Sequence, residues 1–142
     1  MRALAFLSAY PSLNIQLKLS KLYISQDGTL QMDIAIPKIR HTTDKVMVNV
    51  EWMPPEFISS AVDSPIGRVF MLGLLLLKIV NGEPPPLPHN PAAYIVNGPS
   101  PVVYRSEEWP AEVVDFINLC LIKHYAKRPS PEKLLQHPFM RY

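Results

Sequence analysis

The 142-residue chain contains a single cysteine, Cys120, and this scarcity excludes two common ways of stabilising a small protein. One thiol cannot close an internal disulfide, and no set of cysteines is present to bind a structural zinc ion. Such a composition fits a reducing compartment, so a cytoplasmic location is expected. Cys120 lies in an apolar stretch, which favours a small buried side chain over a nucleophile.

Charge is also scarce, since charged residues make up 18% of the chain and the formal net charge is +2. This near-neutral balance gives no electrostatic reason to expect nucleic acid as a partner. The apolar run at residues 69–77 is bracketed by Arg68 and Lys78 and is far shorter than the about 20 residues that a membrane-spanning helix needs. We therefore expect a helix buried in a protein core and no membrane partner.

Hydrophobic residues make up 48% of the chain, enough for one domain with a packed core. Residues 1–10 are predicted as a helix, although an arginine followed by a short apolar run is also typical of a weak signal peptide. Two short strands are predicted at 22–24 and 29–34. A hairpin turn at Asp27-Gly28 joins them, because this dipeptide tolerates the positive φ that such turns need.

The next segment, residues 35–53, has no clear period and is predicted as a long ordered loop. The sequence Pro54-Pro55-Glu56 then suits a helix start, since proline has a preset φ and lacks the N–H that would lie unpaired there. The strongest helix prediction covers 66–80, and Asn81-Gly82 is a good stop for it.

Residues 83–101 are rich in proline, which resists regular structure. We expect an extended connection with one short helix near 92–96, and a polyproline surface for a partner is the alternative. Two further helices are predicted to begin at Pro110 and at Ser130-Pro131. Their inward-facing residues are expected to be Val113, Ile117, Cys120, Leu121, Leu134 and Leu135.

Several segments, taken in order, resemble parts of a protein kinase domain. Trp52-Met53-Pro54-Pro55-Glu56 looks like the Ala-Pro-Glu signature that closes the activation segment, with Pro54 in place of Ala. The other segments resemble the central helix with its exit and the end of the domain, and they are Leu72–Pro85, Asp115–Ile117, Cys120–Lys123, Lys127–Ser130 and Leu134–Phe139. In sequence, these segments are most similar to the sterile-twenty group, including the kinase domain of class III myosins.

The resemblance covers essentially the whole chain and implies a mainly α fold. It implies a kinase C-terminal lobe with a small β-hairpin and without the N-terminal lobe. Residues 1–142 are then one partial domain, with a catalytic-loop remnant at 14–21, an activation segment at 34–56 and a helical subdomain at 57–142.

One structural pair is implied by the same resemblance. The Glu of the Ala-Pro-Glu signature is bound in the family by an Arg near the last helix, and the matching residues are Glu56 and Arg128. A buried bidentate pair would attach the activation segment to the helices. Without the resemblance, the basic cluster of Lys123, Lys127 and Arg128 is interpreted as a solvated helix end, and both partners as surface charges.

The catalytic loop aligns with residues that differ from the family. Gln16 stands at the position of the catalytic Asp and cannot take up a proton as a general base. Lys18 matches the loop Lys of the family. Lys21 occupies the position of the metal-binding Asn, and an ammonium donates hydrogen bonds and repels Mg²⁺. A less favoured interpretation is that Lys21 replaces the charge of the missing ion toward a phosphate.

Three other positions also depart from the family pattern. The Asp-Phe-Gly position falls on residues 34–36, which hold no metal ligand, while Asp33 lies one residue early and serves as a ligand only if the hairpin register slips. Arg68 replaces the Asp that anchors the catalytic loop, and it has no acceptor for backbone N–H groups. Thr42 and Thr43 are interpreted as ordinary polar loop residues.

The resemblance therefore implies a kinase-like lobe in which no catalytic or metal-binding residue is intact. We expect this chain to bind other proteins without catalysis, and the ATP and Mg²⁺ of the family are not predicted as cofactors. Association through the apolar surface that an N-terminal lobe would cover is also expected. The alternatives are a fragment of a serine/threonine kinase that transfers phosphate from ATP once an N-terminal lobe is present, and a decaying gene product.

Overall fold

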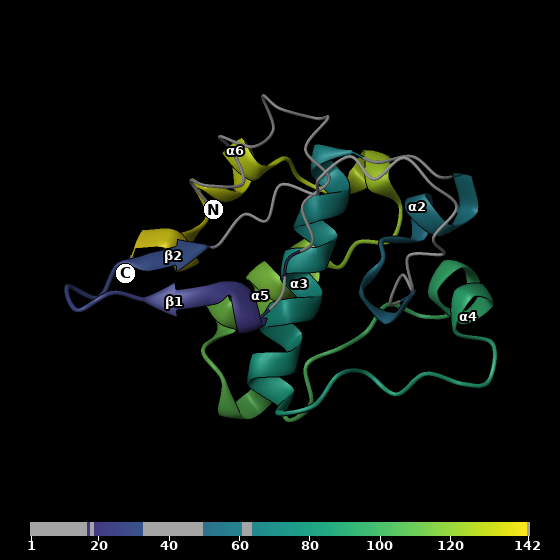
Figure 1. Cartoon of the computed structure of the whole chain (residues 1–142), viewed down its shortest axis with the longest axis horizontal. Coiled ribbons are helices and arrows are strands. Elements are labelled where there is room, and N and C mark those ends of the chain that lie inside the picture. The colour runs from purple at the N-terminus through teal and green to yellow at the C-terminus, as the bar shows by residue number, and fades with distance from the viewer. Residues whose placement is uncertain (1–16, 18, 33–49, 61–63, 142) are drawn as a thin grey trace.

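The structure is a computed structural model that describes residues 17, 19–32, 50–60 and 64–141. Within them the chain forms one β-hairpin and a body of helices (Figure 1). This confirms the predicted mainly α fold with a small hairpin. The helix predicted at 1–10, most of the loop predicted at 35–53 and the two threonines within that loop lie outside the described residues.

The hairpin consists of β1 (Leu22–Ile24) and β2 (Leu30–Met32), which pair antiparallel with Leu22 opposite Met32 and Ile24 opposite Leu30. The first strand has its predicted bounds, whereas the second begins one residue later than predicted. Side chains on one face follow the two-residue period of a strand. Leu22 and Met32 pack on the helical body, and the Ile24–Leu30 pair lies beyond it.

The hairpin turn is closed by the side chain of Asp27. Its carboxylate accepts hydrogen bonds from the Ser25 hydroxyl and from the backbone N and hydroxyl of Thr29. These bonds, led by the one from Ser25, lower the pKa of the Asp27 carboxyl because they favour its charged form. Gly28 has a φ of 80°, the left-handed conformation that the Asp-Gly sequence predicts.

Helix α3 (Pro65–Asn81) lies at the centre of the molecule (Figure 1). Ser64 accepts a hydrogen bond from the backbone N of Gly67 at 3.0 Å, and Gly82 follows the last turn in the left-handed conformation. These local signals explain why the helix lies within one residue of its predicted bounds at each end. No described helix has both the length and the apolar character needed to cross a membrane.

All three apolar clusters of the described chain include buried residues of α3. Phe70, Leu74 and Leu77 belong to the first cluster, Val69 to the second and Leu75 to the third. A helix that is apolar on most sides is stable only when it is enclosed. The long apolar run in the sequence therefore reflects a central position and not contact with lipid.

Helix α5 (Ala111–Cys120) packs directly against α3, and the two backbones approach closely at Gly73. A Cβ atom at Gly73 would lie 2.8 Å from the Cβ of Cys120 and 2.9 Å from the side chain of Leu121. Cys120 and Leu121 are buried, as their positions in the predicted stripe require. Glycine at position 73 thus permits the closest contact in the core.

The remaining helices are short and begin at proline. They are α2 (Pro55–Ser60), α4 (Pro91–Asn97) and α6 (Pro131–Leu134). The cap predicted at Ser130 is present, since its hydroxyl accepts from the backbone N of Lys133 at 3.3 Å. Leu134 is buried as predicted, whereas Leu135 is only half-buried, because α6 ends before it.

The proline-rich connection is held to the end of α3 by one side chain. The Asn81 amide donates to the carbonyl of Val102 at 3.2 Å and accepts from the backbone N of Tyr104 at 2.9 Å. These bonds give the extended segment a fixed return point, since its prolines provide few donors of their own. Apart from α4, the segment has no regular structure, as predicted.

We predict that Gly73→Ala lowers the free energy of unfolding by about 1–3 kcal/mol, because the added methyl group overlaps Cys120 and Leu121. Urea unfolding followed by circular dichroism measures the change. Alanine forms helices better than glycine, so an equal or higher stability of the variant would show that α3 and α5 separate easily. Asn118→Ala, an exposed change on α5, is the control and should stay within about 0.5 kcal/mol of the parent.

Candidate functional site

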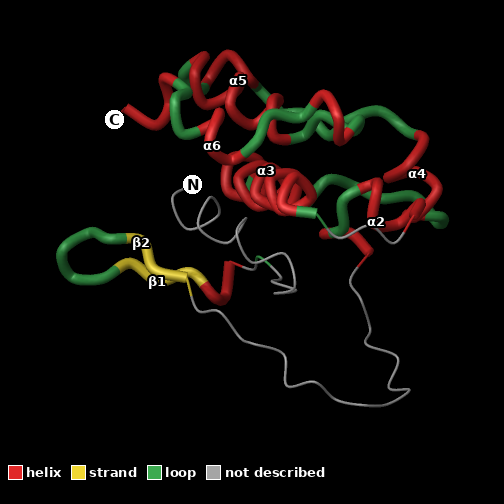
Figure 2. The backbone as a smooth tube through the Cα atoms, turned by 90° about the horizontal axis from the view of Figure 1, so that it is seen from above, coloured by secondary structure: helices red, strands yellow, loops and turns green. Residues whose placement is uncertain are grey.

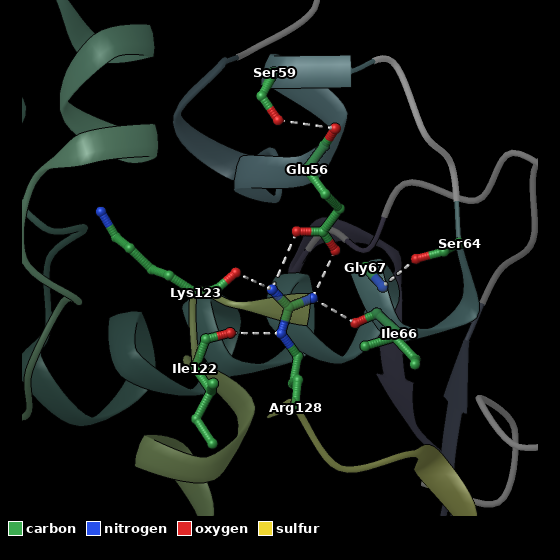
Figure 3. A network of polar contacts seen from close by, with 8 residues as sticks. All are labelled: Glu56, Ser59, Ser64, Ile66, Gly67, Ile122, Lys123 and Arg128. Carbon is green, nitrogen blue, oxygen red and sulfur yellow. Dashed lines mark hydrogen bonds and ion pairs between the residues drawn. The ribbon is translucent and has the colours of Figure 1, made fainter. Parts of the chain in front are cut away.

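The most completely satisfied polar site in the described chain joins Glu56 of α2 to Arg128, which lies 72 residues further along the sequence. Arg128 Nη1 donates to Glu56 Oε1 at 2.7 Å, and Nη2 donates to Oε2 at 3.1 Å (Figure 3). This is the bidentate geometry that arginine and carboxylate groups form most readily. The two residues that the resemblance implied as partners are therefore in direct contact.

The other N–H groups of Arg128 are bound by backbone carbonyls. Nε donates to Ile122 at 2.8 Å, Nη1 to Ile66 at 2.8 Å and Nη2 to Lys123 at 3.2 Å. A guanidinium has five N–H groups, so these three bonds and the two to Glu56 use all of them. One side chain thereby connects α2, the first turn of α3 and the segment that follows α5 (Figure 3).

The pair is enclosed by the protein, with side-chain exposures of 0% for Arg128 and 5% for Glu56. The guanidinium carbon lies 4.8 Å from the centre of the Phe70 ring, which covers one face of the group. Gly67 packs closely beside the carboxylate, because a Cβ there would lie 3.3 Å from Glu56 Oε1. Such burial without compensation would destabilise the fold, and the complete set of hydrogen bonds offsets it.

The interpretation of the basic cluster as a solvated helix end is therefore wrong for two of its three members. Arg128 is buried and Lys123 is half-buried, whereas Lys127 is exposed as predicted. The residues next to these three in the sequence do not reveal which of them is buried, since one of the carbonyls that bind Arg128 belongs to a residue 62 positions away. The motif resemblance was the signal that singled out Arg128, and nothing comparable singled out Lys123.

Most of the catalytic positions predicted from the sequence lie outside the described residues, namely Gln16, Lys18 and Asp33. Lys21 is described, and it ends the 3-10 helix Leu19–Lys21 immediately before β1. Its ammonium donates hydrogen bonds only and carries the same sign of charge as a metal ion. If Lys21 stands at a metal-binding position, as the sequence resemblance implies, its side chain does not fit Mg²⁺.

Arg68 occupies the first turn of α3 and is 2% exposed. A buried guanidinium at this position has donors but no acceptor, so it cannot hold backbone N–H groups as a carboxylate would. Among the described residues, no group of three or more potential metal-ligating side chains is present. The described part of the site thus combines a complete structural ion pair with a second buried arginine in the first turn of α3.

The thiol of Cys120 does not behave as a nucleophile in this setting. The side chain is 0% exposed, and burial raises the pKa of the thiol from 9.0 to about 12, with a smaller opposing effect from the charge of Arg128. The thiolate is the reactive form, and it is almost absent at neutral pH. This supports the prediction that Cys120 is a structural core residue.

Lys123 has a role that the sequence analysis missed. Its ammonium donates to the carbonyls of Tyr94 at 3.1 Å and Gly98 at 2.6 Å, which hold the end of α4. The same side chain lines a cavity between α4 and the proline-rich segment. Its contacts lie 25 and 29 residues away, so no local pattern predicted them.

Comparison with known proteins agrees with this geometry. A family model described as protein kinase domain matches residues 17–140. The chain is also 27% identical, over 150 aligned residues, to serine/threonine-protein kinase PAK 1 of Mus musculus. That alignment covers 99% of the chain and 27% of the mouse protein, so the chain spans about a quarter of the length of this relative.

We predict that Glu56→Gln lowers the free energy of unfolding by about 3–5 kcal/mol, because it leaves the buried charge of Arg128 without its counter-charge. Chemical unfolding in urea measures the difference. The exposed pair of Arg105 and Glu108, whose side chains are 74% and 53% exposed, offers a matched control.

In that control, Glu108→Gln removes the same charge from a solvated pair and should cost no more than about 1 kcal/mol. Equal effects of Glu56→Gln and Glu108→Gln would contradict the structural role of the buried pair. A double variant, Glu56→Gln with Arg128→Met, removes both charges and should recover part of the loss if charge burial is its cause.

We also predict that the Cys120 thiol of the folded chain does not react with a disulfide reagent at pH 8 and reacts fully after unfolding in guanidinium. Folding raises the pKa of this thiol, so its contribution to stability is complete below pH 9.0 and is lost as the pH rises through about 12. Absorbance of the released thiol anion measures the reaction. Rapid labelling of the folded protein would mean that α5 opens readily.

Proposed function

The chain belongs to the protein kinase domain family, and we propose that it acts by binding other proteins and does not transfer phosphate. Its described part has the helical core and hairpin of the C-terminal lobe of that fold. The proposal concerns this chain, which covers about a quarter of its mouse relative. The family match establishes the fold of the chain, whereas the absence of phosphate transfer is part of the proposal.

The observation that carries the proposal is the contrast between the ion pair and the catalytic positions. Glu56 and Arg128 form a pair in which every guanidinium N–H is bonded, so α2 is attached to the helical body by a complete set of hydrogen bonds. Phosphoryl transfer consists mostly of positioning and of stabilising charge, for which the family uses acidic and amide side chains. A fold that keeps this ion pair but lacks the acidic and amide side chains used in catalysis supports a role in binding.

Three residues stand against catalysis. Gln16 cannot accept the proton of a substrate hydroxyl, since its amide has no basic site at neutral pH. Lys21 places an ammonium where the family has a metal-binding amide, and the buried Arg68 replaces a carboxylate. Gln16 lacks a group that takes up a proton, and Lys21 and Arg68 each replace a hydrogen-bond acceptor by a positively charged donor.

The exposed apolar surface of the hairpin supports the binding role. Ile24 and Leu30 form a cross-strand pair whose members are 76% and 63% exposed, and Tyr23 is 53% exposed. Figure 2 shows that the hairpin extends away from the helical body. Apolar groups gathered on one projecting element are typical of a surface that another protein covers.

The finer placement within the family also belongs to this proposal. The motifs at the end of the domain are most similar in sequence to the sterile-twenty group, which includes the kinase domain of class III myosins. A cytoplasmic location is part of the same proposal, because a single buried thiol suits a reducing compartment. The proposal names protein partners and includes neither nucleic acid nor membrane.

We predict that ATP with Mg²⁺ does not stabilise the chain in a thermal-shift titration, because the metal-ligand position carries Lys21. A ligand present at 100 times its Kd would add about 2.7 kcal/mol to the free energy of unfolding, which is readily detected. Saturable stabilisation by ATP that requires Mg²⁺ would overturn the proposal. The kinase domain of mouse PAK 1, measured in parallel, is the positive control for the assay.

A radiolabel assay with generic protein substrates completes this test. No transfer above background is expected from the chain, and the Gln16→Ala variant should give the same background. Transfer that is present in the parent and lost in Gln16→Ala would show activity of the chain itself and would contradict the proposal. Transfer of equal size in both preparations would identify a contaminating kinase.

A further inference from the structure

We propose that the cavity between α4 and the proline-rich segment binds a large aromatic side chain of a partner protein, and that Lys123 binds a carboxylate next to it. This inference rests on the proposed function, because it names the kind of protein segment that the chain would bind. The site lies on a different part of the molecule from the hairpin (Figure 1).

The cavity has a volume of about 230 Å³ and is lined mostly by apolar side chains. Phe70 and Leu74 of α3 contribute to it, together with Pro85 and Pro101 of the connection. Pockets for drug-sized molecules usually measure about 300–1,000 Å³, so this one is small for a nucleotide or a cofactor. Its size suits one large side chain presented by a protein segment.

Aromatic side chains suit this lining best. Tyr94 and Tyr104 line the cavity and are 37% and 40% exposed, so their rings remain accessible to a partner. Met53 lines it as well, and a thioether makes favourable contacts with an aromatic ring. Paired aromatic rings add about 0.5–1.5 kcal/mol beyond the area they bury, which favours an aromatic over an aliphatic occupant.

Lys123 gives the cavity its charge. Its ammonium has three N–H groups, and the carbonyls of Tyr94 and Gly98 take two of them. No carboxylate in the described part of the chain forms an ion pair with Lys123. The ammonium also lies 5.9 Å from the centre of the Tyr94 ring. One N–H and a charge without a carboxylate partner remain for a ligand, and a carboxylate is the complementary group.

The surroundings of Lys123 strengthen its attraction for an anion. Burial lowers the pKa of its ammonium, which shows that the charge is partly removed from water. An opposite charge brought to such a site interacts more strongly than at an open surface. Glu51 also lines the cavity and is exposed, so a ligand with one carboxylate is preferred over one with several negative charges.

The buried ion pair holds this site in place before any ligand arrives. The backbone carbonyl of Lys123 accepts a hydrogen bond from Arg128, while the Lys123 side chain extends away from the pair (Figure 3). The ammonium in turn holds the end of α4 through two carbonyls. A site whose groups are already positioned loses less entropy on binding.

A synthetic peptide tests the inference directly. The probe is the capped hexapeptide acetyl-Gly-Ser-Trp-Glu-Ser-Gly-amide, titrated into the isotope-labelled 142-residue chain and followed by amide chemical shifts. We expect saturable shifts at residues that line the cavity. Replacing the Glu of the peptide by Gln should weaken binding about tenfold or more, the size expected when one charge-assisted hydrogen bond is lost. Replacing its Trp by Ala removes the aromatic occupant and should also weaken binding about tenfold or more.

Variants of the chain separate the site from its surroundings. Lys123→Met should weaken binding of the parent peptide about tenfold and should remove the preference for Glu over Gln in the peptide. Lys127→Met removes an exposed lysine nearby and should leave the affinity unchanged within about twofold. Val102→Glu adds a carboxylate at a 57% exposed position on the cavity lining without altering Lys123, and it should also weaken binding about tenfold.

The result that overturns the inference is a folded chain with no saturable shifts at the cavity, whatever the phosphate-transfer assay shows. Equal affinity for the Glu and Gln peptides in the parent chain would also overturn it. Binding of free 3-indolepropanoate as tight as that of the peptide would indicate a small-molecule site and would exclude a protein partner. Phosphate transfer by the chain would contradict the proposed function alone, since the peptide titration measures a separate site.

Discussion

The buried pair of Glu56 and Arg128 is the interaction on which the arrangement of this chain depends. Arg128 uses every N–H group, and its five acceptors come from α2, the first turn of α3 and the segment after α5. A charge at 0% exposure is tolerated only when it is matched so completely. The pair therefore sets where α2 meets the helical body.

The same pair also fixes the backbone of a residue that lines the cavity beside α4. Because Arg128 binds the carbonyl of Lys123, the backbone there is fixed, and the Lys123 ammonium holds the end of α4. The cavity beside α4 is thus connected to the core by a continuous series of hydrogen bonds. A structural ion pair can support a binding site without taking part in kinase chemistry.

Stability and catalysis place different demands on a kinase fold. The core requires Gly73 for close packing of α3 on α5, the caps of α3 and the buried pair. In the function proposed above, Gln16 and Lys21 replace the proton acceptor and the Mg²⁺ ligand of the family, and they are different residues from those named for the core.

The sequence by itself determined the features that depend on near neighbours and on the chemistry of single side chains. Helix ends followed from Gly82 and Ser130, whose caps act within one turn, and the hairpin turn followed from Asp27-Gly28. Only the tertiary structure decided that Arg128 is buried with all its donors bound and that Lys123 faces a cavity, against the expectation of a solvated helix end. Those properties depend largely on groups 25 to 72 residues away, such as Gly98 for Lys123 and Glu56 for Arg128, and no local pattern contains such distances in space.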